Sequence, residues 1–151
     1  MQKYYYGYDQ FVEDTKELLV PIKKYNPEAV VSIARGGNTF GHFLASGLKR
    51  NELFSINCVH YDDTKKLNSF KISNIPDLSE YKKVLVVDDI VDSGETITEI
   101  LRILKNKYPQ IEFKVATLFF KGDAIIKADF TVHEAKQWIE FFWEKDIFDI
   151  D

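Results

Sequence analysis

The strongest constraint on the fold of this chain is the run of residues 84–96, which reads VLVVDDIVDSGET. Residues 84–87 are wholly apolar, which predicts a strand covered on both faces, as in a parallel sheet. Two adjacent acids, Asp88 and Asp89, stand where that strand would end, and a turn of small polar residues follows. Because ligands of open α/β sheets bind at the carboxyl ends of the strands, the run predicts both a fold class and a site.

The rest of the chain alternates between short apolar runs and segments of helical periodicity. Further strands are expected at residues 29–33, 54–59, 113–120 and 129–133, and helices at 8–22, around 40–48 and over 97–108. In the first helix Asp9 is a candidate N-cap, and Pro21 should kink or end the helix. The alternation predicts an α/β fold with a mostly parallel, twisted sheet flanked by helices. No repeat or long linker divides the chain, so a single domain is expected over residues 1–151.

The composition narrows the class of protein. Hydrophobic residues make up 45% of the chain, so a packed core is expected. Cys58 is the only cysteine, which excludes an internal disulfide and fits a reducing, cytoplasmic compartment. The net charge of −4, without a basic block, argues against nucleic acid as a partner. The sequence holds no secretory leader or long apolar run, so no membrane is expected as a partner either.

Residues 60–79 lose the periodicity of a strand or a helix and hold many charged and polar residues. A long mobile loop or a small flap is expected there, and within it the region from Tyr61 to Lys71 is a candidate lid. Loops of this length inside a compact domain often cover a functional site. A solvated surface excursion explains the composition equally well.

The turn after the central strand carries the chemistry. Gly94 would let the backbone come close to a ligand, and the hydroxyls of Ser93 and Thr96 would stand at a helix N-terminus, where unpaired N–H groups bind phosphate. Asp88 and Asp89 could accept hydrogen bonds from a sugar diol or hold a magnesium ion. A ribose 5-phosphate fits both halves. The alternative, that these residues only cap a helix and solvate a strand end, explains each of them singly but not the whole group.

Residues 84–96 resemble the phosphoribosyl pyrophosphate (PRPP) motif of the type I phosphoribosyltransferases, in which a hydrophobic strand leads into two acids and a D-[ST]-G-x-T turn. Three further segments resemble the 6-oxopurine branch of that family, especially its short bacterial xanthine-guanine and hypoxanthine members. These are Ala34-Arg35-Gly36-Gly37 as the pyrophosphate loop, Phe120-Lys121 as the base-recognition site, and Trp138-Ile139-Glu140 as the purine-stacking segment. The correspondence runs in order over nearly the whole chain.

The resemblance implies a role for each matched residue. Asp92 would be the catalytic proton acceptor, and Lys121 would donate to the purine O6 and so select 6-oxopurines over adenine. Trp138 would stack on the base, in a purine-binding segment with Ile139 and Glu140. The residues that bind PRPP would be Arg35, Gly36, Gly37, Asp88, Asp89, Asp92, Ser93, Gly94, Glu95 and Thr96, with a cis peptide between Arg35 and Gly36. Asp88 and Asp89 would also hold Mg²⁺.

These motifs are expected to meet at the carboxyl edge of one parallel sheet, because each follows a predicted strand. A small hood formed by the two terminal segments would cover the cleft. The family relationship implies a purine-salvage enzyme, a pentosyltransferase that converts guanine, xanthine or hypoxanthine and PRPP to a nucleoside 5′-monophosphate and pyrophosphate. It also implies Mg²⁺ as cofactor, PRPP and a purine base as partners, and a homodimer or homotetramer.

Two alternatives stay open within the same fold. One is a nucleotide-binding regulator with a phosphoribosyltransferase fold, and the other is a phosphoribosyltransferase for another base. A response-regulator receiver domain also begins with an LVVDD strand, but too few residues follow Asp89 for the rest of such a domain. The sequence does not rank guanine, xanthine and hypoxanthine.

Overall fold

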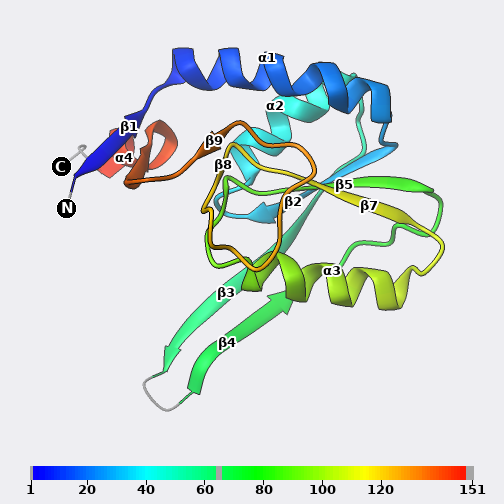
Figure 1. The fold of residues 1–151 in the computed structure, drawn as a ribbon. Coiled ribbons are helices and arrows are strands. Elements are labelled where there is room, and N and C mark those ends of the chain that lie inside the picture. The colour runs from blue at the N-terminus through cyan, green and yellow to red at the C-terminus, as the bar shows by residue number, and fades with distance from the viewer. Residues whose placement is uncertain (1, 64–65, 149–151) are drawn as a thin grey trace.

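The computed structural model describes residues 2–63 and 66–148 and places a five-stranded sheet at its centre (Figure 1). The strand order is β4-β3-β2-β5-β7. The strands are β2 (Ala29–Ala34), β3 (Leu53–Asp63), β4 (Lys66–Ser73), β5 (Lys83–Val87) and β7 (Glu112–Ala116). Neighbouring strands are parallel, except that the edge strand β4 runs antiparallel to β3. The predicted α/β fold with a mostly parallel sheet is confirmed.

Helices cover both faces of this sheet. Helices α1 (Tyr8–Tyr25) and α2 (Asn38–Leu48) lie on one face, and α3 (Glu95–Lys107) lies on the other (Figure 1). In β5, Leu85 and Val87 pack in a hydrophobic cluster with residues of α1 and α2, whereas Val84 and Val86 pack in a second cluster with residues of α3. A strand covered on both faces must be apolar at every position, which explains the VLVV run. Among the described residues, no helix is long and apolar enough to cross a membrane.

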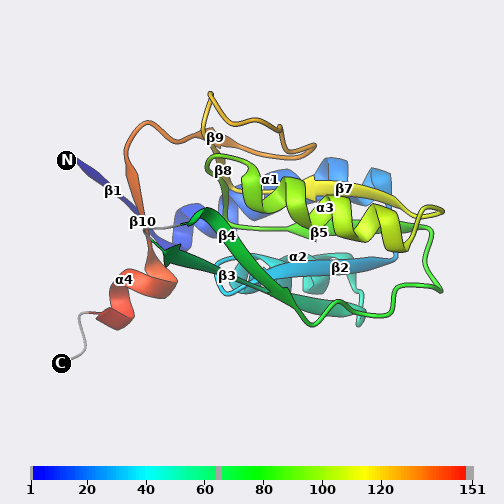
Figure 2. The same ribbon diagram turned by 90° about the horizontal axis from the view of Figure 1, so that it is seen from below.

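The two ends of the chain form a hood beyond the carboxyl ends of the parallel strands (Figure 2). Strand β1 (Lys3–Tyr6) pairs in parallel with β10 (Trp138–Phe141), and helix α4 (Phe142–Phe148) follows β10 directly. A small parallel sheet of β6 (Ile90–Val91), β8 (Phe119–Phe120) and β9 (His133–Glu134) lies between the hood and the central sheet. The hood of terminal segments is therefore confirmed.

The first helix differs from its prediction at both ends. Its N-cap is Gly7, and no side chain caps it, whereas Asp9 lies within the first turn, where an acid suits the helix dipole. The helix also continues through Pro21 to Tyr25. Pro21 is exposed, so the bond that its missing N–H cannot make falls on the water-facing side of the helix. The buried face therefore continues to Ile22 and Tyr25 despite the proline.

The strand predicted at 113–120 is two strands, β7 and β8, with an interruption at Thr117. The Thr117 hydroxyl donates to the carbonyl of Phe119 at 2.8 Å, and its N–H donates to the carbonyl of Phe130 at 2.9 Å. These bonds turn the chain out of the central sheet and into the small one. The strand predicted at 129–133 is likewise reduced to an isolated bridge at Phe130 and the short β9.

Either a long loop or a small flap was expected at residues 60–79. The loop is wrong for most of the first half, where the chain forms a hairpin that agrees with the expectation of a flap. The backbone of 60–63 and 66–73 belongs to the antiparallel pair β3 and β4, with residues 64 and 65 outside the described part. The last parallel pair of β3 is Ala34↔Asn57, so β3 continues well past the edge of the sheet and the hairpin stands beside the site (Figure 1). Irregular chain begins only after Ser73, and it is anchored by Leu78, which is fully buried.

Candidate functional site

The loop after β2 and the end of β5 are packed against each other. A Cβ on Gly37 would lie 2.6 Å from the carbonyl oxygen of Val87, and one on Gly36 would lie 2.6 Å from the Asp89 carboxylate. Only glycine therefore lets the two segments come this close. The peptide between Ala34 and Arg35 is cis, so the expectation of a cis Arg35–Gly36 peptide is wrong by one residue.

Asp88 and Asp89 stand at the end of β5 and are only partly exposed. The Asp89 N–H donates to the Asp88 carboxylate at 2.8 Å, and the Ile90 N–H donates to the Asp89 carboxylate at 2.7 Å. Burial raises the pKa of both carboxyls, and the neighbouring charge of Asp89 raises the pKa of Asp88 further. A cation or a donor from a ligand would relieve this cost, because it would stabilise the charged forms.

These two carboxylates fit a magnesium site in which the protein and the substrate each supply ligands to the ion. Carboxylate oxygens are hard donors, and Mg²⁺ is usually held by one or two of them, with the remaining positions filled by water and substrate phosphates. Within the ranges 2–63 and 66–148, no group of three or more His, Cys, Asp or Glu side chains could hold a metal by itself. The pair could therefore hold Mg²⁺ only together with a ligand such as a phosphate.

The turn 92–96 begins helix α3 in the geometry expected of an anion site. Gly94 has φ 91°, a left-handed conformation that favours glycine, and the Glu95 N–H donates to the Ser93 hydroxyl at 3.2 Å. A cavity of about 210 Å³ lies over this turn and is lined by Asp88, Asp89, Ile90, Val91, Asp92, Ser93, Gly94, Thr96, Ile97 and His60. A phosphate in this cavity would lie at a helix N-terminus, where backbone N–H groups and the helix dipole favour an anion.

His60 is a site residue that sequence reasoning did not find. It lies on β3 where the hairpin passes the edge of the sheet, and its Nε2 is 2.9 Å from the Thr96 hydroxyl. Its ring packs edge-on against Phe70 of β4, with centroids 4.6 Å apart. No sequence pattern singled out His60, because it stands at the start of a segment that was expected to be a loop.

Asp92 and Lys121 face each other although they come from different loops. Lys121 Nζ lies 2.8 Å from Asp92 Oδ1, and this hydrogen bond and the charge of Asp92 raise the pKa of Lys121. The backbone sets this pairing, since the Lys121 N–H donates to the carbonyl of Val91 at 2.9 Å. The side chains are 46% and 65% exposed, and an ion pair this exposed adds little to stability. The pair is therefore available to a ligand.

A second cavity, of about 560 Å³, opens beside this ion pair under the hood. Its lining residues come from the end of β5, from Lys121 and from the hood; they are Asp89, Ile90, Asp92, Lys121, Ala135, Lys136, Gln137, Trp138, Ile139, Phe141 and Glu144. Trp138 is 60% exposed, so its ring is not a core side chain. Glu144 of α4 was not singled out in the sequence, and its charge contributes to the raised pKa of Asp89, after burial.

Some predicted residues lie outside these two cavities. Glu140 is in β10 but is absent from the described lining residues, and its carboxylate lies 4.0 Å from Lys145 Nζ. Four of the predicted PRPP-binding residues are also absent from both linings; they are Arg35, Gly36, Gly37 and Glu95. The expectation of a single sheet edge needs correction as well, because Lys121 follows β8 of the small sheet rather than a strand of the central one.

The chain is similar to known proteins over nearly its whole length. Residues 8–147 match the family described as phosphoribosyl transferase domain. A xanthine-guanine phosphoribosyltransferase from Roseobacter denitrificans is 26% identical over 93% of this chain and 85% of its own length. The solved structure of a xanthine-guanine-hypoxanthine phosphoribosyltransferase from Helicobacter pylori has a TM-score of 0.92 and 39% identity, covering 99% of this chain and 98% of that one. A hypothetical protein from Neisseria gonorrhoeae, solved with bound ppGpp, has a TM-score of 0.80 and 25% identity, with 95% and 89% covered.

The turn at Gly94 gives a direct test of the site's backbone. Gly94→Ala should lower the free energy of unfolding by about 1–3 kcal/mol, because alanine is strained at this φ. Its Cβ would also lie 2.9 Å from Ile126 Cγ2. Denaturant unfolding of the variant and the wild type measures the change.

Gly122→Ala is the matched control. The Cβ added there would meet only the end of the flexible Glu134 side chain, so its unfolding free energy should stay within about 0.5 kcal/mol of the wild type. Equal losses in the two variants would show that the left-handed turn at Gly94 is not the cause.

Proposed function

Because the chain belongs to the phosphoribosyl transferase domain family, we propose that it is a purine-salvage enzyme of the 6-oxopurine branch. It transfers the phosphoribosyl group of PRPP to guanine, xanthine or hypoxanthine and releases pyrophosphate. The observation that carries the proposal is the pair of Asp92 and Lys121 beside an apolar cavity walled by Trp138. The similarity to xanthine-guanine phosphoribosyltransferases over nearly the whole chain supports the same reaction.

The ion pair complements one edge of a 6-oxopurine. O6 and N7 are neighbouring positions on that edge, and a donor and an acceptor 2.8 Å apart can engage both of them. Lys121 would donate to O6, and Asp92 would accept the proton of N7–H. Adenine carries an amino group at position 6, so it would place a donor against the lysine. The pair thereby favours oxopurines without any contact to the other edge of the ring.

The remaining residues would hold PRPP. The turn of Asp92, Ser93, Gly94, Glu95 and Thr96 binds the 5-phosphate at the start of α3, where the cavity of about 210 Å³ is open. Asp88 and Asp89 accept hydrogen bonds from the ribose hydroxyls. The backbone of Arg35, Gly36 and Gly37 meets the pyrophosphate. The space beside the Asp89 carboxylate, which a Cβ on Gly36 would fill, supports this assignment.

Mg²⁺ is the proposed cofactor, and Asp88 and Asp89 would hold it together with PRPP. When bound, it would supply positive charge against the pyrophosphate oxygens and so stabilise the leaving group. The raised pKa of both carboxyls supports this role, because a nearby cation favours their ionised forms.

The reaction is a substitution at the anomeric carbon of the ribose. The purine N9 forms a bond to this carbon as the bond to pyrophosphate breaks, and the N7 proton passes to the Asp92 carboxylate. Trp138 stacks on the base, and Lys121 fixes its rotation, so that N9 points toward the ribose. The region from Tyr61 to Lys71 is the proposed lid against water, and the position of β3 and β4 beside the site supports it.

The domain organisation, the compartment and the oligomeric state of the protein are also proposals. We take residues 1–151 as one domain, because the two hydrophobic clusters share the strands of one sheet. A cytoplasmic homodimer or homotetramer is supported by the single cysteine and by exposed aromatic residues such as Tyr5 and Phe148. A second candidate function, a nucleotide-binding regulator, is favoured only by the likeness to the Neisseria protein with bound ppGpp.

The role of Asp92 is tested by Asp92→Asn. This variant should keep its stability, because the pair is exposed, but should form nucleotide about 10²-fold more slowly, since the proton acceptor is lost. Single-turnover rates with PRPP, Mg²⁺ and guanine measure the chemical step. Asp123→Asn removes a second exposed carboxylate near Lys121 and should leave this rate unchanged. A wild-type rate in Asp92→Asn would remove Asp92 from the proposed role.

The role of Lys121 is tested by Lys121→Gln. Loss of a charged donor should raise the KM for the 6-oxopurine by about 10- to 100-fold while the KM for PRPP stays within about twofold. Lys127→Gln is the control, because this exposed lysine lies outside both cavity linings. An equal rise in both KM values would contradict the assignment of Lys121 to the base.

A further inference from the structure

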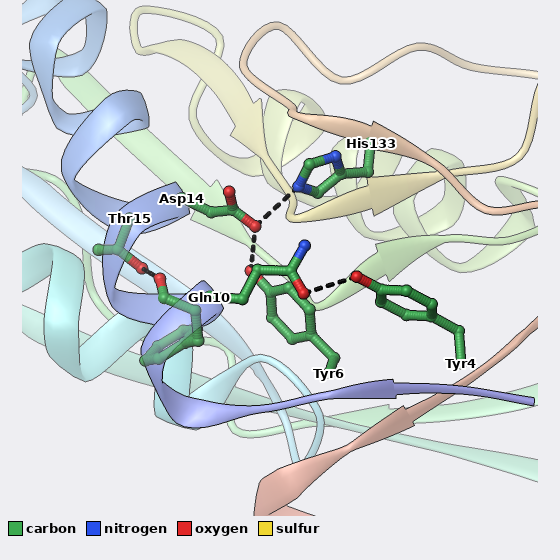
Figure 3. A network of polar contacts seen from close by, with 7 residues as sticks. Tyr4, Tyr6, Gln10, Asp14, Thr15 and His133 are labelled. Carbon is green, nitrogen blue, oxygen red and sulfur yellow. Dashed lines mark hydrogen bonds and ion pairs between the residues drawn. The ribbon is translucent and has the colours of Figure 1, made fainter.

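Asp14 of α1 joins two distant segments of the chain through one oxygen atom. Its Oδ2 accepts a hydrogen bond from the Tyr6 hydroxyl at 2.6 Å and lies 2.8 Å from Nε2 of His133. A carboxylate only accepts hydrogen bonds, so the histidine Nε2–H is the donor. Figure 3 shows the three side chains pointing toward one another from β1, α1 and β9.

The surroundings hold this contact in one geometry. Tyr6 is fully buried, and its ring packs edge-on against Phe119 at 4.9 Å and Phe141 at 5.9 Å. Burial, and then the hydrogen bond to Asp14, raise the pKa of Tyr6, so its hydroxyl keeps the proton that it donates. The Asp14 side chain is only 10% exposed. Hydrogen bonds in such a setting are stronger than those in water and hold their partners firmly.

The two joined segments carry the residues that we assign to the base. Tyr6 ends β1, and β1 pairs along its length with β10, the strand of Trp138. His133 begins β9, which pairs with β8, and Lys121 follows β8. The Asp14 carboxylate therefore connects β1, which pairs with the strand of Trp138, to β9, which pairs with the strand before Lys121.

Residues 135–139 lead from β9 into β10 and include Trp138. This segment, which we call the wall, has a cavity on each side. On one side is the cavity of about 560 Å³ that we assign to the base. On the other side is a cavity of about 280 Å³, lined in part by His133, and Lys136, Gln137 and Ile139 line both cavities. The wall has little close packing to fix it, because Lys136, Gln137 and Trp138 are exposed and only Ala135 and Ile139 pack against the hydrophobic core. Its position depends on its ends, which are β9 and the pairing of β10 with β1.

We propose that Asp14 is a positioning residue for the purine, acting through Tyr6 and His133 to set the place of the wall that carries Trp138. The inference rests on the proposed function and extends it to a residue that lines neither reaction cavity. When the link is cut, the wall moves away from the stacking position and the base binds more weakly. The proposed PRPP site is built from the loop after β2, the end of β5 and the start of α3, so it is unaffected.

Tyr6→Phe and Thr15→Val are a matched pair for the test. Each removes one buried hydroxyl, but the Thr15 hydroxyl donates at 2.7 Å to the carbonyl of Phe11 within α1, so its loss leaves the hood intact. Tyr6→Phe should raise the KM for the base by about 3- to 10-fold, the effect of one lost hydrogen bond, with the KM for PRPP within about twofold. Thr15→Val should change neither KM, although both variants lower the melting temperature.

A second pair uses the other donor. His133→Leu should raise the KM for the base as Tyr6→Phe does, and His133→Gln, which keeps a side-chain N–H donor, should restore most of the affinity. Reduced stability without a change in the ratio of the two KM values would show that the link is only structural and overturn the proposal. Wild-type protein that forms no nucleotide with any 6-oxopurine would instead overturn the proposed function, so the two failures are distinguishable.

Discussion

Strand β5 is covered on both faces by hydrophobic side chains, and it ends at Asp88 and Asp89. The burial of these two carboxyl groups raises their pKa values and makes them costly to ionise. Every other part of the site is arranged around that end. Gly36 and Gly37 allow the loop after β2 to lie against it, and the turn at Gly94 brings the start of α3 beside it. The apolar strand fixes the position of the acids, and their raised pKa values favour a cationic or hydrogen-bonding ligand.

The chemistry that we propose at the base is separated from the stability of the fold. Asp92 and Lys121 are exposed and lie on loops, whereas the backbone bond between Lys121 and Val91 holds those loops together. Substitution of either side chain can therefore change the reaction without unfolding the protein. The proposed role of Asp14 gives the hood the opposite arrangement, since the exposed ring of Trp138 would depend on the buried link of Tyr6, Asp14 and His133.

The sequence predicted the parts of the molecule that are set by local patterns. The VLVV run and the D-S-G-E-T turn identified β5 and the start of α3, because burial on two faces and a helix N-terminus each leave a clear sequence signal. The pairing of β3 with β4 was missed, since residues 66–73 are charged or polar at most positions and hold no continuous apolar run. His60 and Glu144 were missed because only the tertiary fold brings them to the cavities. The course of α1 past Pro21 was likewise decided by tertiary burial of its inner face.

We propose that the edge formed by Asp92 and Lys121 selects a 6-oxopurine as the acceptor of the phosphoribosyl group of PRPP. Incubation of the wild-type protein with PRPP, Mg²⁺ and, separately, guanine, xanthine, hypoxanthine, adenine and orotate measures this selection directly through nucleotide formation. We expect nucleotide with at least one of the three oxopurines and none with adenine or orotate. Nucleotide formed from adenine or orotate alone would contradict it.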